Sequence, residues 1–502
     1  MGWILLVVYI IGWHIGLYGT FKKAGIEPWK ALIPIYNTWC IVQKTQIRKI
    51  WFWLQLIPIA GQFITIWISI IWVMHFGKFS LLDHAAVTFI PFIYMPYVGF
   101  SPNVKYIGHE GFARYRKSGA REWIDAAVFA IVAATIIRTF VFEAYTIPTE
   151  SMEKTLLVND FLFVNKMSYG ARIPQTPLSF PFVHNIMPFT TTTPSYTTLV
   201  QLPYSRIAGF GDVQRNDVVV FNFPAGDTII NLPEFGSKQP YYDVLRNNFG
   251  GNRERLMAEY PLLVHPMDKT DNYIKRCVGI GGDTLMIKDG QVYINSKASP
   301  IPVSSQTEYI VETNGQPFDD EFLKNELNIN TEEGANGQIY PFEGKANSWV
   351  MNMSPEDAVK VKKQPNFKSM EMAFVHIPGS TFPYDTLHEW SADNFGPIFI
   401  PKRGSTITLT SQNIGVYSRL IQTYEGNTLE QRGDKYFING KETITYTCKW
   451  NYYWMMGDNR HRSQDSRYWG FVPETHIVGK ASLIWFSWQG GPRWNRLFKS
   501  IK

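Results

Sequence analysis

Ser151 is the first residue whose type and position suggest covalent chemistry. It lies in TIPTESMEKTL (146–156), shortly after the apolar run 123–142, and the chain continues as LLVNDFLFVNK, which alternates like a strand. A serine at the boundary of an element is normally a cap or a solvated residue. As a nucleophile it would need a base, and the sequence contains no Gly-x-Ser-x-Gly elbow. The histidines lie in loop-rich sequence or in a charged run, so a Ser/His/Asp triad is not indicated (His184, His265, His376, His388, His461).

Lys275 is the candidate for the missing base. It follows Ile274 in DNYIKRCVGIGGDTL (271–285), which has the apolar pattern of a strand. A free lysine has a pKa of about 10.4, whereas a general base works best with a pKa of about 7–8. That difference corresponds to on the order of 4 kcal/mol, which burial of the ammonium group against apolar side chains can supply. The alternative is a solvated lysine on the wet face of a strand.

A third polar segment, MMGDNRHRSQDSRYWGFVP (455–473), enters an aromatic strand. Gly457-Asp458-Asn459 is a turn signal. Asp465 and Arg467 are close enough in sequence to form an ion pair, and Ser463 and Ser466 carry small hydroxyls that could orient an amine. On its own the segment is equally typical of an ordinary ordered turn.

Four apolar segments precede these motifs and could anchor them to a membrane: 3–19, 51–75, 85–100 and 123–142. Basic residues gather in two loops, one between the first two segments and one just before the last (Lys22, Lys23, Lys30, Lys44, Arg48, Lys49; Lys105, Arg114, Arg116, Lys117, Arg121). Since basic loops stay in the cytoplasm, we expect four crossings with the N-terminus outside. The segment 85–100 contains two prolines, so it is expected to be either a kinked span or a re-entrant piece. Everything from about residue 143 is then expected on the extracytoplasmic side.

The rest of the chain has the pattern of a β-rich protein with long insertions. Residues 215–224 predict a buried strand, and 284–295 and 434–447 predict hairpins with Asp-Gly and Asn-Gly turns. The ranges 171–210 and 225–270 are expected to be loop-rich. The range 300–430 is expected to be a mixed insert with helix near 320–327 and 355–362.

The composition excludes several classes of protein. Of the 502 residues, 45% are hydrophobic and 18% charged, so the chain is not disordered. The net charge of +6 is dispersed, with no basic block that would indicate a nucleic-acid partner. The three cysteines have no zinc spacing; Cys277 and Cys448 could pair outside the cytoplasm, or all could be free and buried.

Four segments, in this order, resemble the bacterial type I signal peptidases, which are membrane-bound endopeptidases with a catalytic serine and lysine. They are RTFVFEAYTIPTESMEKTL, RNDVVVFNFP, YIKRCVGIGGDTL and GDNRHRSQDSRYWGFVPETHIVGKA, and the apolar run before the first of them also matches. The resemblance implies that Ser151 is the nucleophile and Lys275 its general base. The Ser151 backbone N–H and the Thr149 hydroxyl would form the oxyanion hole, where the family often has serine at the second place.

Further roles follow from the same resemblance. Ser463 would orient the lysine amine, and Asp465 and Arg467 would support the site as a pair. Shallow pockets for small substrate side chains would be lined by Tyr145, Ile147, Pro148, Met152, Leu156 and Ile274. No metal or other cofactor is implied.

One departure from the family concerns the residues after Ser151. The family commonly has Ser-Met-x-Pro-Thr-Leu, whereas this chain has Ser-Met-Glu-Lys-Thr-Leu. Lys154 is a rival base by its proximity in sequence, but its polar neighbours predict that it stays hydrated and protonated. Glu153 adds a charge beside the nucleophile.

The expected architecture is a mostly β extracytoplasmic catalytic domain with a signal-peptidase-like fold and large inserts, preceded by transmembrane α-helices. In chain order we expect a multi-span module at 1–122, a final transmembrane helix at 123–143, a catalytic core at 144–299 with a loop-rich insert at about 171–270, an inserted subdomain at 300–433, and the completed core with its tail at 434–502. Residues GIEPWKALIPIYNTW and the spans after them resemble small multi-span modules of other bacterial membrane proteins.

The expected function is removal of N-terminal signal peptides from exported preproteins at A-x-A-like sites, at the outer face of the bacterial inner membrane. The expected partners are preproteins, the lipid bilayer and the export translocon, with no nucleic acid. The aromatic, basic tail WFSWQGGPRWNRLFKSIK could lie on anionic lipid or be a solvated end. Two alternatives remain: a self-cleaving Ser/Lys protein of the repressor type, and an inactive membrane-anchored binding protein. Four apolar runs and the presence of both Ser151 and Lys275 argue against them.

Overall fold

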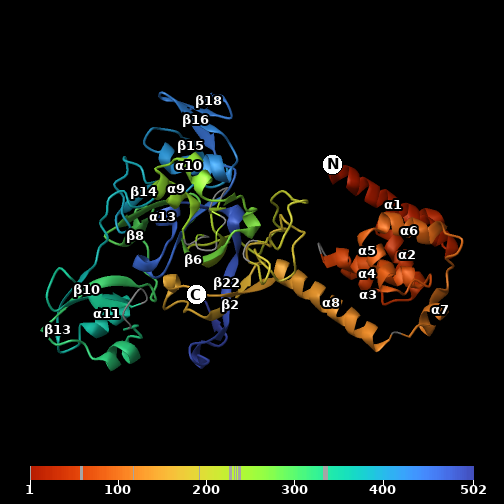
Figure 1. Cartoon of the computed structure of the whole chain (residues 1–502), viewed down its shortest axis with the longest axis horizontal. Coiled ribbons are helices and arrows are strands. Elements are labelled where there is room, and N and C mark those ends of the chain that lie inside the picture. Colours follow the sequence, from red (N-terminus) through yellow and green to blue (C-terminus); the bar gives the residue numbers. More distant parts are fainter. Residues whose placement is uncertain are drawn as a thin grey trace. The chain divides into compact units, whose positions relative to one another are not determined.

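Two units make up the chain, residues Met1–Ala133 and Ala134–Lys502 (Figure 1). The structure is a computed structural model, and it describes residues 2–56, 60–116, 118–190, 193–224, 229–230, 232, 235, 239–331 and 337–501. Each unit has hydrophobic clusters of its own.

The first unit is helical. Its helices are α1 (Gly2–Lys23), α2 (Tyr36–Thr45), α3 (Ile50–Leu54), α4 (Ala60–Met74), α5 (Leu81–Phe89), α6 (Pro91–Phe100), α7 (Gly108–Arg114) and the first part of α8 (Gly119–Phe140). Glycines let α1 and α6 approach closely: a Cβ on Gly16 would lie 2.3 Å from the backbone of Met95, and one on Gly19 would lie 2.9 Å from Gly99. Such small-residue contacts are typical of helices packed within a membrane.

The structure contains helices that correspond to only some of the expected membrane spans. Among the described residues, one helix is long and apolar enough to cross a membrane, Glu122–Phe140, and it corresponds to the last expected span. The helices α5 and α6 pass the same test only as a pair, and they are bent by 119° at their junction, where Pro91 starts α6. The expected span 51–75 is divided into α3 and α4, and residues 57–59 lie outside the described part. The four-crossing topology therefore stays a prediction.

The second unit is mostly β, as predicted, and is built on an antiparallel sheet of eight strands. The sheet order is β1-β2-β22-β3-β6-β20-β21, with β23 beside β22. The strands are β1 (Phe142–Thr146), β2 (Asp160–Asn165), β3 (Val218–Asn222), β6 (Asn272–Gly279), β20 (Tyr452–Met456), β21 (Val472–Pro473), β22 (Ile477–Ser487) and β23 (Lys499–Ser500). All five residues of β3 are buried, so the strand predicted within 215–224 is confirmed.

Smaller sheets surround this one. The predicted hairpins are both present: β7 (Thr284–Lys288) pairs with β8 (Gln291–Ile294), and β17 (Lys435–Ile438) pairs with β18 (Lys441–Thr443). Asp289-Gly290 and Asn439-Gly440 all have positive φ, as a type I′ turn requires. The remaining strands of these sheets are β9 (Lys297–Ala298), β14 (Phe395–Phe399), β15 (Thr406–Thr408), β16 (Leu429–Arg432) and β19 (Thr445–Thr447).

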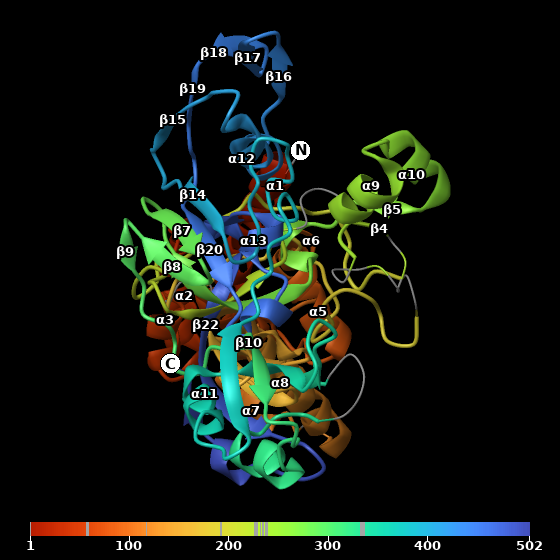
Figure 2. The ribbon, with the colours of Figure 1, turned by 90° about the vertical axis from the view of Figure 1, so that its left-hand side faces the viewer.

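The insert after residue 300 contains a subdomain with its own core. Its sheet has the order β11-β12-β10-β13, from β10 (Thr307–Thr313), β11 (Ile339–Pro341), β12 (Ser348–Met353) and β13 (Phe367–Met372). The two predicted helical stretches are confirmed as a π-helical turn at Phe322–Glu326 and as α11 (Pro355–Val361), which Ser354 and Asp357 cap. Figure 2 shows β10 and α11 at one end of this unit and β16–β18 at the other, as in Figure 1.

The range 225–270 contains more regular structure than predicted. Its described residues include β4 (Ile229–Ile230), α9 (Tyr241–Phe249), α10 (Arg253–Glu259) and β5 (Leu262–Leu263). The missed signals are the Asn252 side chain, which accepts a hydrogen bond from Arg255 N, and Gly250 with a φ of 57° at the end of α9. The last helices are α12 (Ile414–Arg419) and α13 (Ser466–Trp469).

The three cysteines are free and buried, which excludes the alternative of a disulfide between Cys277 and Cys448. Cys277 belongs to a cluster with Val219 and Phe221, whereas Cys448 belongs to a different cluster around the hairpin sheets. Each thiol therefore acts as a small apolar core group.

Candidate active site

Ser151 lies on a single 3-10 turn, Glu150–Met152, that follows β1. The turn is fixed from both sides of the chain, because Ile147 N donates to Asp160 O (2.9 Å) and Leu156 N donates to Met152 O (2.7 Å). Met152 and Leu156 have no exposed surface and pack with Ile147 beneath the turn. The apolar residues around Ser151 thus hold the serine at the surface of the core, where it is 8% exposed.

The loop that follows β20 holds the turn Glu150–Met152 through hydrogen bonds to its carbonyl groups. Asn459 N donates to Ser151 O (3.1 Å), and Asn459 Nδ2 donates to Glu150 O (3.1 Å). A Cβ on Gly457 would lie 2.5 Å from Ser151 O and 2.2 Å from Ser463 Oγ, so only glycine fits this close approach. The glycine and asparagine of the Gly-Asp-Asn turn thereby fix the backbone of the serine.

Lys275 lies on β6, opposite Val219 of β3, and is only 3% exposed. Its Nζ is 2.6 Å from Ser151 Oγ, within hydrogen-bond distance. Burial lowers the pKa of Lys275 to about 8, although the carboxylates of Asp465 and Asp458 act in the opposite direction. With this pKa about a tenth of the amine is neutral at pH 7 and able to accept a proton from the serine hydroxyl.

Both of these carboxylates are paired with arginines. Arg467 Nε and Nη2 each lie 2.9 Å from Asp465, as the predicted pairing requires, and both side chains are fully buried. Arg276 donates to both oxygens of Asp458, at 2.8 and 2.7 Å. Each guanidinium offsets the negative charge that would otherwise stabilise the lysine cation.

The pair of Arg276 and Asp458 was missed from the sequence. Thr155 Oγ1 also donates to Asp458 Oδ2 (2.5 Å), so this carboxylate links β6 to the segment after the serine. The signal in the sequence for this ion pair was the Lys-Arg pair in YIKRC. Adjacent residues of a strand point to opposite faces, so Lys275 faces Ser151 and Arg276 faces Asp458.

The remaining candidate residues are distributed around Ser151 and Lys275. Thr149 Oγ1 is 3.4 Å from Ser151 Oγ, so the two hydroxyls lie side by side. Ser463 is 5% exposed, and within the described residues its Oγ has no hydrogen-bond partner. It lies beside Gly457, and its predicted contact with the lysine amine is not among the hydrogen bonds of this structure.

The six expected pocket residues divide into two groups. Ile147, Met152 and Leu156 are buried, so they form the floor beneath the serine and not its accessible wall. Pro148 is exposed, and Tyr145 and Ile274 are half-buried. Only the last three present surface to a bound peptide in this structure.

Lys154 is partly buried and ion-paired, whereas its polar neighbours predict a hydrated side chain. It is 3.3 Å from Asp357 Oδ2 and donates to Leu327 O, both in the inserted subdomain. These partners occupy its ammonium group, so Lys154 connects the serine segment to the insert and is not free to act as a base.

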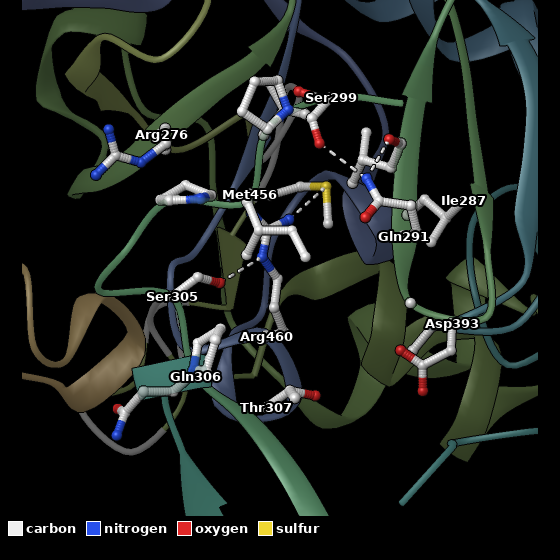
Figure 3. A pocket seen from close by; sticks show the side chains of 18 of the residues that line it. Arg276, Ile287, Gln291, Ser299, Ser305, Gln306, Thr307, Asp393, Met456 and Arg460 are labelled. Atoms are coloured by element: carbon white, nitrogen blue, oxygen red, sulfur yellow. Dashed lines mark hydrogen bonds between the residues drawn. The ribbon is translucent and has the colours of Figure 1, made fainter. Parts of the chain in front are cut away.

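A small cavity of about 70 Å³ lies where the insert meets the core (Figure 3). Figure 3 shows Arg460 at its centre, with Nε 3.3 Å from Ser305 Oγ and Nη1 3.4 Å from Met456 Sδ. Ser151 and Lys275 do not line this cavity, and it is too small for a peptide. It belongs to the contact between the insert and the loop that carries Asn459.

Two protein-family models match parts of this chain. The model of the signal peptidase family, peptidase S26, matches residues 120–358 and 403–488. The match includes Ser151, Lys275 and the whole segment 455–473, and it omits 359–402. A second model, a family of unknown function (DUF5684), matches residues 29–109 in the helical unit.

Curated relatives cover most of the chain. Signal peptidase I of Haemophilus influenzae is 26% identical over 77% of this chain and 77% of its own length. Signal peptidase I of Buchnera aphidicola from Acyrthosiphon pisum is 25% identical over 74% of this chain and 79% of its own length. That of Aquifex aeolicus is 23% identical over 73% and 84%. The protein is therefore a signal peptidase, and the chain belongs to the peptidase S26 family.

Proposed function

We propose that this signal peptidase removes N-terminal signal peptides from exported preproteins at A-x-A-like sites, by a dyad of Ser151 and Lys275. The observation that carries the proposal is the 2.6 Å separation of Lys275 Nζ and Ser151 Oγ, with the lysine 3% exposed. A buried amine within hydrogen-bond distance of a hydroxyl is the arrangement that a lysine base requires.

The acylation step begins with the neutral amine of Lys275. It takes the proton of the Ser151 hydroxyl as Oγ forms a bond to the scissile carbonyl carbon, and the carbonyl electrons move to its oxygen. The Ser151 backbone N–H and the Thr149 hydroxyl stabilise this oxyanion, and such a donor is typically worth about 3–4 kcal/mol. The resulting lysine ammonium then gives its proton to the departing amine as the C–N bond breaks.

Deacylation uses the same groups. A water molecule loses a proton to Lys275 and attacks the acyl carbon, and the proton returns to Ser151 Oγ when the ester bond breaks. Gly457 lies close to both the Ser463 hydroxyl and the Ser151 carbonyl. The Ser463 hydroxyl orients the Lys275 amine between these steps. The ion pair of Asp465 and Arg467 keeps the loop of Ser463 in place.

The substrate is proposed to bind as an extended strand. β1 is a terminal strand of the main sheet, and among the described strands residues 272–275 of β6 pair only with β3. The two strands therefore offer backbone groups to a peptide on either side of Ser151. Tyr145, Pro148 and Ile274 form the accessible walls, and shallow pockets there reject large side chains by steric exclusion. Ile147, Met152 and Leu156 contribute the floor.

The proposed location is the bacterial inner membrane, with the second unit on the periplasmic side. The helix Glu122–Phe140 ends one residue before β1, so Ser151 stays close to the point where the chain leaves the bilayer. The further spans of a multi-pass anchor, the lipid bilayer and the export translocon as partners belong to the same proposal. So do the domain boundaries at 122, 143, 299 and 433.

Cleavage of a preprotein with an A-x-A site tests the proposal. The detergent-solubilised parent is expected to release the signal peptide, whereas Ser151→Ala and Lys275→Ala are expected to be inactive. Ser205→Ala and Lys297→Ala, which change an exposed serine and an exposed lysine, are the matched controls and should cleave like the parent. Cleavage by Lys275→Ala would assign the base to another residue, and an inactive parent would refute the proposed substrate.

A further inference from the structure

A second cavity, of about 220 Å³, lies away from Ser151 and Lys275, at the outer end of α8. Thr135, Arg138 and Thr139 in the last turns of α8 line it together with residues 172–184 and 267–269. The cavity is smaller than the roughly 300–1,000 Å³ typical of sites for drug-sized ligands. Its place beside the last turn of the helix that we propose to span the membrane corresponds to the depth of lipid headgroups.

The lining of this cavity is cationic. Four basic side chains (Arg138, Lys166, Arg172, Lys269) face two carboxylates (Glu143, Asp268). Glu143 is already paired, with Arg138 Nε at 2.7 Å and Lys166 Nζ at 2.8 Å. Asp268 Oδ2 accepts hydrogen bonds from the backbone N and the hydroxyl of Thr176. A net positive charge remains in the cavity.

Lys269 and Arg172 are the cations of this lining that have no carboxylate of the described chain within ion-pair distance. Arg172 donates instead to Asn222 Oδ1 and Thr475 O. Lys269 is 8% exposed. Its Nζ donates to the neutral Ser179 Oγ (3.1 Å), and it lies 5.4 Å from the ring centre of Tyr196. Burial lowers the pKa of Lys269, so an anion in the cavity would restore the stability of its charged form.

The loop 171–210, which forms one wall of the cavity, exposes many apolar side chains. Its two arms are joined by backbone hydrogen bonds, such as Ile173 N to Ser205 O (3.0 Å) and Phe180 N to Ser195 O (2.7 Å). It forms part of the yellow segment near the end of α8 in Figure 1. Its exposed large apolar side chains include Leu178, Phe180, Phe182, Ile186, Phe189 and Leu199.

Such a group of exposed apolar side chains normally marks an interaction site. Phe180 and Phe182 also line the cavity and are 56% and 51% exposed. Apolar side chains beside a cationic cavity, at the end of a membrane helix, match a lipid in which acyl chains adjoin a phosphate. A soluble anion would explain the charge but not the apolar wall.

We propose that this cavity binds the phosphate of an anionic phospholipid headgroup, with Lys269 as its principal cation, while the apolar side chains of the 171–210 loop enter the outer leaflet. The proposal rests on the membrane anchoring proposed above and is independent of the proteolytic chemistry. Lipid bound here would hold the second unit, and with it Ser151, at a fixed height over the bilayer.

Native mass spectrometry of the full-length, detergent-solubilised protein can count bound lipids. The probes are phosphatidylglycerol, phosphatidylcholine and inorganic phosphate, each at the same concentration. The first phosphatidylglycerol should bind more tightly than phosphatidylcholine, and inorganic phosphate should not displace it. Lys269→Gln should weaken this first binding about tenfold, as loss of a charge-assisted contact predicts, whereas Lys269→Arg should retain it. Lys297→Gln, on the exposed strand β9, is the matched control.

A second pair of variants tests the apolar wall without altering a buried charge. Phe180→Ser combined with Phe182→Ser should also weaken phosphatidylglycerol binding, whereas Ile444→Ser, another exposed apolar residue, should not. Ser151→Ala should bind lipid like the parent, which separates this result from any failure of proteolysis.

Several outcomes would overturn the proposal. Equal binding of the two lipids would refute the preference for an anionic headgroup, and displacement by inorganic phosphate would assign the cavity to a free anion. Unchanged lipid binding in Lys269→Gln would remove the assigned residue. Loss of preprotein binding in that variant, with lipid binding intact, would assign the cavity to the substrate instead.

Discussion

Asn352 of β12 donates a hydrogen bond from Nδ2 to Asn459 Oδ1 (2.9 Å), and both side chains are fully buried. Asn459 in turn holds the carbonyl groups of Glu150 and Ser151. The inserted subdomain therefore determines which way the Asn459 amide faces, and so contributes to the position of Ser151. In this protein the insert is part of the support of the candidate active site.

Asn352→Ala should lower kcat and leave KM nearly unchanged, because it affects the serine turn and no substrate pocket. Loss of one buried hydrogen bond, at about 1–1.5 kcal/mol, predicts a decrease of about tenfold. Steady-state cleavage of a preprotein measures both constants. Asn314→Ala, at an exposed asparagine of the same subdomain, is the control and should behave like the parent. An equal loss in both variants would indicate general damage to the insert.

Lys275→Met should stabilise the protein at neutral pH while abolishing cleavage. Burial lowers the lysine pKa from 10.5 to about 8, which corresponds to about 3 kcal/mol of destabilisation whenever the buried amine must be protonated. The destabilisation is complete below about pH 8, decreases as pH rises toward 10.5, and is absent above that value. Thermal unfolding of the two proteins at pH 7 and at pH 10 should therefore show a larger difference at pH 7. A parent that is more stable than Lys275→Met at both values would contradict the buried, uncompensated amine.

Lys154→Met should retain most of the cleavage activity, since the Lys154 ammonium is engaged with Asp357 and Leu327 O and not with Ser151. We expect a loss below about tenfold, the order of a single ion pair that is partly screened by solvent. The same assay with Lys275→Met is the reference for loss of the base. Loss of activity in Lys154→Met would make Lys154 a candidate for the general base again.

Glu153→Gln should stabilise the protein more at pH 8 than at pH 5. Burial, together with the neighbouring charge of Glu150, raises the pKa of Glu153 to about 7. A carboxyl group with a raised pKa destabilises the fold when it ionises, so the effect appears as pH rises from about 4.5 to 7 and is full above 7. Thermal unfolding at the two pH values measures it, with the exposed Glu371→Gln as control. A larger gain in thermal stability at pH 5 than at pH 8 would contradict the raised pKa of Glu153.

The sequence indicated Ser151 and Lys275 as a candidate pair because the pattern around each residue is local. Lys275 stands within an apolar alternation, and Ser151 follows an apolar run directly, so each position could be interpreted from a few neighbours. The hairpins were predictable for the same reason, since Asp289-Gly290 and Asn439-Gly440 specify their own turns.

Long-range partners were not predictable. Asn352 and Asn459 are 107 residues apart, and nothing in either neighbourhood indicates that they meet. Lys154 was expected to be hydrated because its sequence neighbours are polar, yet its partners come from the insert. The burial of Ile147, Met152 and Leu156 also depends on strands that are distant in the sequence, such as β22.

The pH dependence of kcat/KM for preprotein cleavage tests the central claim most directly, because it reports the pKa of the base in the free enzyme. We predict that kcat/KM rises about tenfold per pH unit below pH 8 and levels off above a midpoint of about 8, since only the neutral amine of Lys275 can accept the serine proton. A profile that is flat between pH 6 and 9, or whose midpoint stays near the 10.5 of an unperturbed lysine, would contradict a buried Lys275 as the base.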